Sequence, residues 1–97
     1  MRLSKKTIKI LQDNIKKSFG EVNIYLFGSR TDDTKKGGDI DIAIDTSLSR
    51  QEFRKKRALF LAHLIRLDFD YDIDVVNYNT NDELLYNEIR ESSVKLD

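Results

Sequence analysis

The sequence predicts a small layered domain in which helices cover a β-sheet. Segments with the apolar period of a helix alternate along the chain with short runs rich in β-branched and aromatic residues. Glycines mark the breaks, because the chain contains four glycines and no proline. This alternation favours a sheet covered by helices over a helical bundle or a barrel. At a length of 97 residues, we expect one domain over residues 1–97.

A first helix is expected over residues 4–19. Its apolar positions recur at helical spacing, with lysines between them: Leu3, Ile8, Leu11, Ile15 and Phe19. Gly20 stands where a C-terminal helix cap belongs. The next segment, residues 22–27, is short and apolar and is followed by Gly28, which predicts a strand leading into a tight turn.

Two further strands are predicted by residues that alternate between apolar and polar. Residues 39–45 carry isoleucine at every second position and aspartate at three of the others. Residues 71–76 alternate in the same way, which places Tyr71, Ile73 and Val75 on one face of that strand.

A second helix is predicted between these two strands, up to about Leu67. Ser49 and Glu52 have the spacing of a capping box, with Ser49 as N-cap and Glu52 at N3. Leu48 and Phe53 flank this pair as a hydrophobic staple. The expected apolar stripe consists of Phe53, Phe60, Leu61, Leu64 and Leu67.

The C-terminal part of the chain predicts one more helix and an edge strand. Thr80 and Glu83 have the spacing of another capping box, ahead of an apolar helical pattern over residues 81–91. Residues 94–96 are expected to add a short edge strand.

The composition excludes several classes of protein. Lys+Arg and Asp+Glu both number 17, so no basic excess predicts a nucleic-acid groove, and no direct nucleic-acid binding is expected. Without cysteine, the chain has no disulfide framework and no thiolate metal site. No apolar run resembles a signal peptide or approaches the ~20 residues of a membrane span. We therefore expect a cytoplasmic protein that does not bind membranes.

Asp39 and Asp41 form the most informative pair of residues. Positions i and i+2 of a strand share a face, so the two carboxylates are expected side by side. Asp72 and Asp74 repeat the pattern on a later strand, and carboxylates gathered on one surface would repel one another unless a cation lies among them. Mg²⁺ suits such oxygen ligands, whereas the spacing does not fit an EF-hand loop. A solvent-facing polar strip on a half-buried sheet is the alternative explanation of each pair.

Gly28, Ser29 and Arg30 are the candidate phosphate-binding residues. Ser29 is expected to cap a short helical turn, with Asp32 at N3. Free backbone amides at such a helix start bind phosphate, so the structural and functional interpretations coexist. Arg30 adds positive charge, and the Gly-Lys-Ser/Thr of a Walker loop is absent.

Three other features are more simply explained by structure. The single histidine, His63, lies mid-helix and is interpreted as a packing or surface residue rather than a catalytic base. The basic run at residues 54–57 is interpreted as a solvated helix face that an acidic partner could also meet. Lys35 and Lys36 are interpreted as solubilising loop residues, with phosphate contact as the alternative.

The chain resembles the minimal nucleotidyltransferases of the DNA polymerase β-like superfamily. The matching segments are Leu26-Phe27-Gly28-Ser29-Arg30, Gly38-Asp39-Ile40-Asp41-Ile42-Ala43-Ile44 and Ile73-Asp74-Val75-Val76. The resemblance extends over nearly the whole chain and implies an α+β fold, a small mixed sheet flanked by helices. It departs near the end, where Ser92-Ser93 replaces a glycine that the family often has after its last helix.

The resemblance implies transfer of AMP from ATP, with pyrophosphate leaving. Asp39, Asp41 and Asp74 would be the catalytic residues and would ligand two Mg²⁺ ions, and Asp74 would help to deprotonate the acceptor hydroxyl. Gly28, Ser29 and Arg30 would hold the triphosphate. Asp74 is preferred over Asp72 as the third ligand because two apolar strand residues follow it, as in the family; Asp72 stays a second candidate.

Small members of this superfamily also resemble one half of a two-gene system. Their partner is an all-helical HEPN protein, often an RNase toxin, and the nucleotidyltransferase acts as antitoxin by transferring AMP to a tyrosine of that partner. A chain of this length is expected to have no acceptor-binding domain of its own, which suits such a hetero-oligomer. The alternative is a non-catalytic binding module that neutralises a helical HEPN partner by contact alone.

Overall fold

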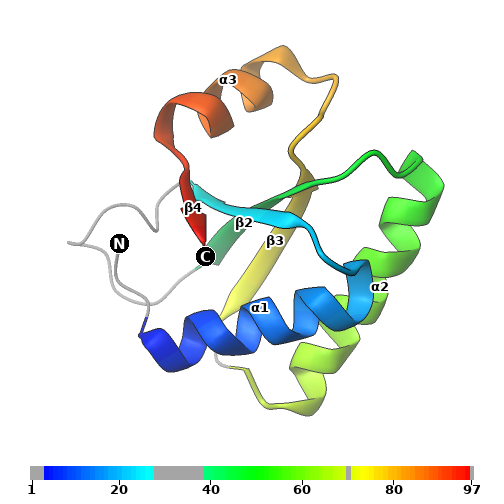
Figure 1. Ribbon diagram of the computed structural model, residues 1–97, viewed down its shortest axis with the longest axis vertical. Helices are drawn as coiled ribbons and strands as arrows, with labels where there is room; N and C mark the ends of the chain where they lie inside the picture. The colour runs from blue at the N-terminus through cyan, green and yellow to red at the C-terminus, as the bar shows by residue number, and fades with distance from the viewer. Residues whose placement is uncertain (1–3, 28–38, 70, 97) are drawn as a thin grey trace.

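The computed structural model describes residues 4–27, 39–69 and 71–96, and for Asp39 it describes the backbone alone. Helices and strands alternate through these ranges (Figure 1). In chain order they are α1 (Lys5–Phe19), β1 (Asn23–Phe27), β2 (Asp39–Asp45), α2 (Arg50–Arg66), β3 (Asp72–Asn77), α3 (Glu83–Ser92) and β4 (Val94–Leu96).

The four strands form one mixed sheet in the order β3-β2-β1-β4. β1 pairs antiparallel with both β2 and β4, whereas β2 and β3 are parallel and are connected through α2. A parallel pair needs a long crossover, and the helix α2 provides it. The α+β class and the mixed sheet flanked by helices are therefore confirmed.

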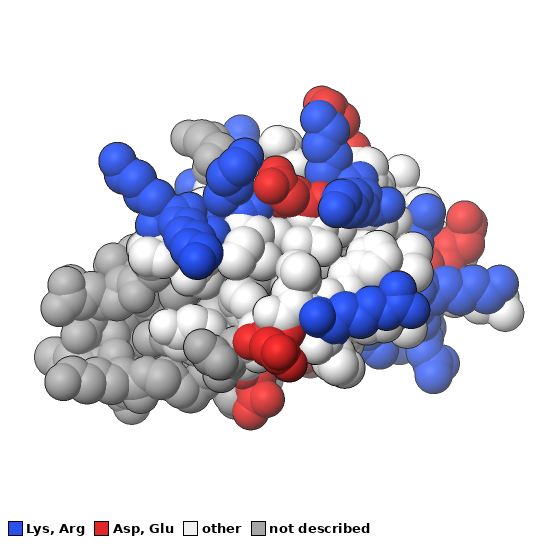
Figure 2. All heavy atoms as spheres, turned by 90° about the horizontal axis from the view of Figure 1, so that it is seen from below, with Lys and Arg blue, Asp and Glu red and all other residues white. Residues whose placement is uncertain are grey.

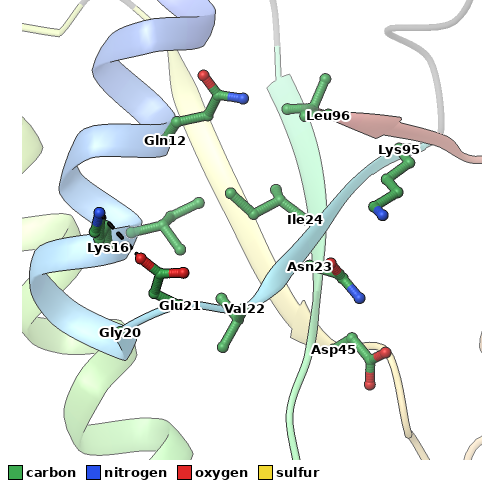
Figure 3. A pocket seen from close by; sticks show the side chains of 11 residues that line it. Gln12, Lys16, Gly20, Glu21, Val22, Asn23, Ile24, Asp45, Lys95 and Leu96 are labelled. Carbon is green, nitrogen blue, oxygen red and sulfur yellow. Dashed lines mark ion pairs between the residues drawn. The ribbon is translucent and has the colours of Figure 1, made fainter.

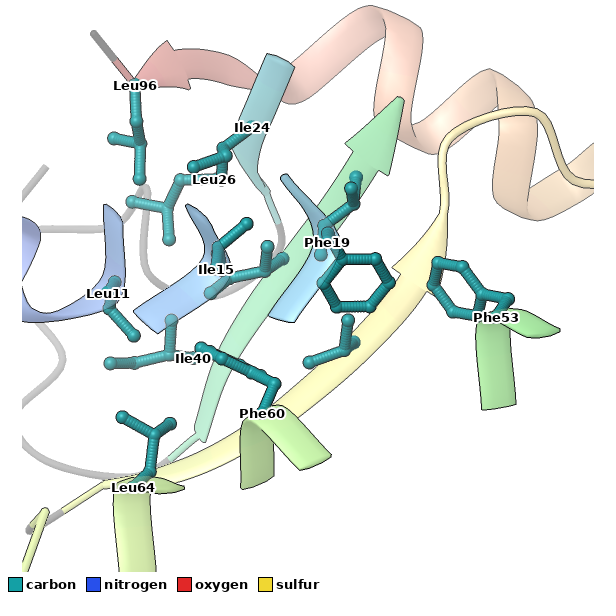
Figure 4. Close-up of a cluster of buried hydrophobic side chains, with 13 residues drawn as sticks. Leu11, Ile15, Phe19, Ile24, Leu26, Ile40, Phe53, Phe60, Leu64 and Leu96 are labelled. Carbon is teal, nitrogen blue, oxygen red and sulfur yellow. The ribbon is translucent and has the colours of Figure 1, made fainter. Parts of the chain in front are cut away.

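The main core lies between the sheet and the helices α1 and α2 (Figure 4). Ile40, Ile42 and Ile44 point into it from β2 and are fully buried, as their alternation predicted. Their partners are apolar side chains from both helices and the other three strands: Leu11, Ile15, Phe19, Ile24, Leu26, Phe53, Phe60, Leu64, Val75 and Leu96.

A smaller core lies on the opposite face, where α3 packs. Ile89 of α3 is fully buried against Ala43 of β2 and Phe27 of β1. Figure 1 shows α3 on one side of the sheet and α1 with α2 on the other. The two faces of β2 are therefore covered by different helices.

Two predicted helix caps are present, Gly20 at the end of α1 and Ser49 at the start of α2. Ser4 accepts a hydrogen bond from the Thr7 backbone N–H at 3.1 Å and begins α1, and Gly20 ends it with a φ of 83°. Ser49 accepts from the Glu52 N–H at 3.1 Å and begins α2, so the predicted N-cap is confirmed. The Ser49 hydroxyl also donates to the Glu52 carboxylate at 3.4 Å.

The start of α3 differs from the prediction. Asp82, not Thr80, is the N-cap, since its carboxylate accepts from the Leu85 N–H at 3.2 Å. The Thr80 hydroxyl instead accepts from the Asp82 N–H at 3.2 Å and shapes the turn that precedes the helix. α3 therefore begins at Glu83, two residues later than expected.

The end of α2 differs as well. Leu67 was expected on the buried stripe, but it is the C-cap of α2 and is 55% exposed. The helix ends at Arg66, so Leu67 no longer follows its period. No helix in the described ranges is both long and apolar enough to cross a membrane.

Candidate active site

The strands that carry the four central aspartates are direct neighbours. In the parallel ladder between β2 and β3, Asp39 is the backbone partner of Asp72, and Asp41 is the backbone partner of Asp74. Neighbouring strands lie about 4.8 Å apart, and partners in a ladder point to the same side of the sheet. The Asp41 and Asp74 carboxylates are therefore brought together on one surface.

This surface is the part of the α3 face that lies beyond the contact with α3. Ala43 and Val76, two residues further along β2 and β3, pack against the α3 core, which ends before the carboxylates. Asp41 is half-buried, and Asp72 and Asp74 are exposed. The predicted pairing of two strand-borne carboxylate pairs is thus present in the backbone register.

Phe27 lies on the other side of Asp41 and closes the apolar part of the site. It is buried and is the antiparallel partner of Asp41. β1 therefore ends beside the carboxylates. The predicted phosphate-binding residues Gly28, Ser29 and Arg30 follow it in sequence and lie outside the described residues.

Asp45 has a structural role that the sequence analysis missed. The amide of Asn79 donates to its carboxylate at 2.8 Å and to the Thr46 carbonyl oxygen at 3.1 Å. These bonds connect the end of β2 to the segment after β3. The signal was weak, because asparagine after a strand is typical of any turn.

The donors fit a magnesium ion, although the described residues do not complete a ligand set. No group of three or more His, Asp or Glu side chains that could hold a metal occurs in the part of the chain whose side chains are described, which leaves out Asp39. Asp41 and Asp74 offer hard carboxylate oxygens on adjacent strands, and the exposure of Asp74 leaves room for water and phosphate oxygens. This donor chemistry is what Mg²⁺ prefers.

His63 lies away from this surface. It belongs to α2, which covers the opposite face of the sheet, and its Nδ1 is buried without a hydrogen-bond partner among the described residues. His63 therefore lies away from the carboxylates, which agrees with its interpretation as a packing or surface residue.

A hollow among the described residues is also distant from the carboxylates. It measures about 530 Å³ and lies between α1, the start of β1 and β4 (Figure 3). Lys16 and Glu21 form an ion pair of 3.1 Å on its wall, and Asp45 and Lys95 line it. Because Asn23 and Asp45 mark the opposite end of the β1–β2 pair from Phe27 and Asp41, this hollow is not the candidate active site.

A second feature missed at the sequence level is an aromatic cluster on the α3 face. The rings of Tyr25 and Tyr78 have centroids 4.6 Å apart, and Tyr78 contacts Tyr86 edge-on at 6.0 Å. Arg90 lies over the Tyr86 ring at 5.5 Å. The spacing of Tyr86 and Arg90 along α3 was the one available signal.

The mixed sheet, its two helical layers and the paired strand carboxylates define a nucleotidyltransferase-type domain. The model of the polymerase β nucleotidyltransferase family matches residues 5–96, and the chain belongs to this family. The resemblance to minimal nucleotidyltransferases is thereby confirmed.

Solved structures share the fold. A toxin–antitoxin complex with AMP-PNP matches with a TM-score of 0.70 at 22% identity, over 93% of this chain and 72% of that chain. A variant of the MntA–HpeT toxin–antitoxin complex, with two aspartates replaced by glutamate, matches with a TM-score of 0.63 at 28% identity, over 98% of this chain and 73% of that chain. A complex of an MNT antitoxin with a tri-AMPylated HEPN toxin from Shewanella oneidensis matches with a TM-score of 0.55 at 28% identity, over 95% of this chain and 66% of that chain. None of the curated proteins matches this sequence.

Proposed function

We propose that this chain transfers AMP from ATP to a hydroxyl group of a helical HEPN toxin and thereby acts as its antitoxin. The observation that carries the proposal is the register of Asp41 with Asp74 on the open part of the α3 face. Family membership supports nucleotidyl transfer as the reaction. The AMPylated toxin in one structural relative supports a protein acceptor.

Asp39, Asp41 and Asp74 are the proposed ligands of two Mg²⁺ ions. Bound there, the ions would stabilise charge on the attacking oxygen and on the leaving pyrophosphate. Asp74 is the exposed member of the Asp41–Asp74 pair, so its carboxylate is the one that an incoming acceptor can reach. In the reaction, the acceptor oxygen bonds to the α-phosphorus of ATP while the bond to pyrophosphate breaks, and a carboxylate oxygen of Asp74 takes the hydroxyl proton.

Gly28, Ser29 and Arg30 are the proposed triphosphate-binding residues. The support comes from their sequence and from the end of β1, since Phe27 is paired with Asp41. Backbone amides and a serine hydroxyl at this position suit phosphate oxygens, and arginine adds a charge-assisted contact.

The acceptor is proposed to be a tyrosine of the HEPN partner. The described part of this chain forms one sheet with three helices, and in this proposal the partner supplies the far wall of the site. The relatives in which a toxin and an antitoxin form a complex support such an arrangement.

The test uses ATP labelled at the α-phosphate, Mg²⁺ and the protein encoded by the adjacent gene. We expect label on a tyrosine of that protein and loss of labelling in the D39N/D41N double variant. Asp45→Asn is the matched control, because asparagine still accepts the hydrogen bond from Asn79. Equal labelling by wild type and D39N/D41N would overturn the enzymatic proposal. Neutralisation of the toxin by a folded D39N/D41N protein would favour a module that acts by contact alone.

A further inference from the structure

The outer side of α2 concentrates positive charge in a chain that is neutral overall. The helix carries six Lys and Arg residues and one Glu, a net charge of +5, whereas the whole chain has 17 of each sign. Figure 2 shows mostly lysine and arginine side chains, with some acidic ones among them, around an uncharged area on the side of the molecule that α1 and α2 form. A charge imbalance of this kind steers an oppositely charged partner.

The same side of α2 presents apolar side chains to solvent. Ala58, Ala62 and Ile65 follow one another at successive turns on the side opposite the buried Phe60 and Leu64. The Ile65 side chain is 76% exposed, although isoleucine is among the residues most often buried in folded proteins. Two alanines in line allow another helix to approach closely, because the distance between helix axes depends on the side chains at the contact.

An apolar groove continues this surface toward β3. It measures about 290 Å³, and its walls come from the end of α2 and the start of β3: Leu61, Leu64, Ile65, Phe69, Tyr71, Asp72 and Ile73. β3 is the outermost strand of the sheet, so the groove opens at its edge. Asp72 belongs both to this groove and to the strand that bears Asp74.

We propose that the outer face of α2 and this groove bind an acidic amphipathic helix of the acceptor protein. The inference rests on the proposed function and adds the surface on which the acceptor is held. Ile65 and the groove would receive the apolar side of the partner helix, and Arg54, Lys55 and Arg66, all exposed, would meet its acidic side. Asp72 lines this groove and stands two positions before Asp74 on β3.

The observations disfavour other occupants. A second copy of this chain would bring its own helix of net charge +5 against the first, and like charges repel. A single-stranded nucleic acid stacks its bases on exposed aromatic side chains, whereas Phe53 and Phe60 of α2 are buried. Phe69 and Tyr71 of the groove are half-buried, and their rings contact each other at 5.7 Å. An interfacial membrane helix carries Trp, Phe or Leu along its lipid side, and the line of Ala58, Ala62 and Ile65 on α2 contains none of these.

The test measures the Kd of the full-length chain for the protein encoded by the adjacent gene, by titration calorimetry. We expect Ile65→Asp and R54E/K55E each to weaken binding by at least about tenfold, as truncation of central interface residues does. Leu84→Asp is the matched control, since Leu84 is 84% exposed on α3. Lys5→Glu/Lys6→Glu is the matched charge control on α1, where both lysines are exposed.

Several results would overturn the docking surface. The first is a wild-type chain that does not bind the protein encoded by the adjacent gene. The second is that the α2 variants bind it with the same Kd as the wild type. The third is that the control variants lose as much affinity as the α2 variants. Tighter binding of the wild type to a 30-nucleotide RNA or to phosphatidylserine vesicles, lost in Ile65→Asp, would assign the face to those ligands instead.

The kinetics of AMP transfer distinguish a failure of the docking surface from a failure of the proposed function. If docking positions the acceptor, Ile65→Asp raises the KM for the partner and leaves kcat close to the wild-type value. Wild-type affinity without any AMP transfer would contradict the proposed function and leave the docking surface standing. AMP transfer with an unchanged KM in both α2 variants would contradict the docking surface alone.

Discussion

Asp41 and Asp74 are direct partners in the parallel ladder between β2 and β3, and their side chains lie on the same side of the sheet. Replacing either residue with asparagine keeps the size of the side chain and removes its negative charge. We expect AMP transfer to fall at least about a hundredfold in each variant, a typical loss when a proton-transferring group is removed. The rate of label transfer checks this, with the melting temperature as the control for folding.

Asp72 and Asp74 lie two positions apart on β3 and are both exposed, so their roles can be compared directly. Asp74 is paired with Asp41, and Asp72 with Asp39 near the start of the strands. We expect Asp74→Asn to lower transfer at least about a hundredfold and Asp72→Asn to lower it only about tenfold, the smaller loss typical of a residue that supports a metal ligand. The reverse order would make Asp72 the third ligand.

The sequence predicted the strands better than their arrangement. β2 has the predicted bounds, because Ile40, Ile42 and Ile44 alternate strictly and are all buried. Its parallel register with β3 could not be predicted from either strand alone, since it depends on how α2 packs across the sheet. The side-chain roles of Gly28, Ser29 and Asp39 stay predictions from the sequence.

Competing local signals explain the errors. Thr80 and Asp82 are both good N-cap residues, and the sequence pattern of a capping box favoured Thr80, whereas the geometry of the turn after β3 leaves Asp82 at the helix start. Leu67 continued the apolar period of α2 in sequence, but the helix ends one residue before it. Helix ends are set by such local contacts more than by periodicity.

The cap of α3 can be tested by comparing two alanine variants. Asp82→Ala removes the acceptor for the Leu85 N–H, and we expect it to lower the free energy of unfolding by about 1 kcal/mol. Thr80→Ala removes only a turn contact and is expected to cost less. Urea denaturation of both variants measures the difference; a larger loss for Thr80→Ala would contradict the assigned cap.

Two positions of the α2 apolar pattern, Phe60 and Leu67, should respond differently to truncation. Phe60 is fully buried in the main core, and Phe60→Ala is expected to lower the free energy of unfolding by about 3 to 5 kcal/mol through loss of contacts and a cavity. Leu67→Ala should change it by less than about 0.5 kcal/mol, as is usual at exposed positions. Similar losses in both variants would mean that Leu67 packs into the core.

Magnesium binding has a consequence that does not depend on catalysis. A ligand that binds only the folded chain raises its stability, by about 2.7 kcal/mol when its free concentration is a hundred times the Kd. We therefore expect the melting temperature of the wild type to rise with Mg²⁺ concentration in the absence of ATP. In Asp41→Asn and Asp74→Asn the rise should be lost, because each variant removes a proposed ligand from the paired strands. Asp45→Asn is the control that should keep this rise, since the Asp45 carboxylate accepts a hydrogen bond from Asn79.

The experiment is a thermal melt followed by circular dichroism, with Ca²⁺ and added NaCl of equal ionic strength to separate specific from general ion effects. An equal rise in all four proteins would assign the stabilisation to screening of the surface charges and would contradict a carboxylate metal site.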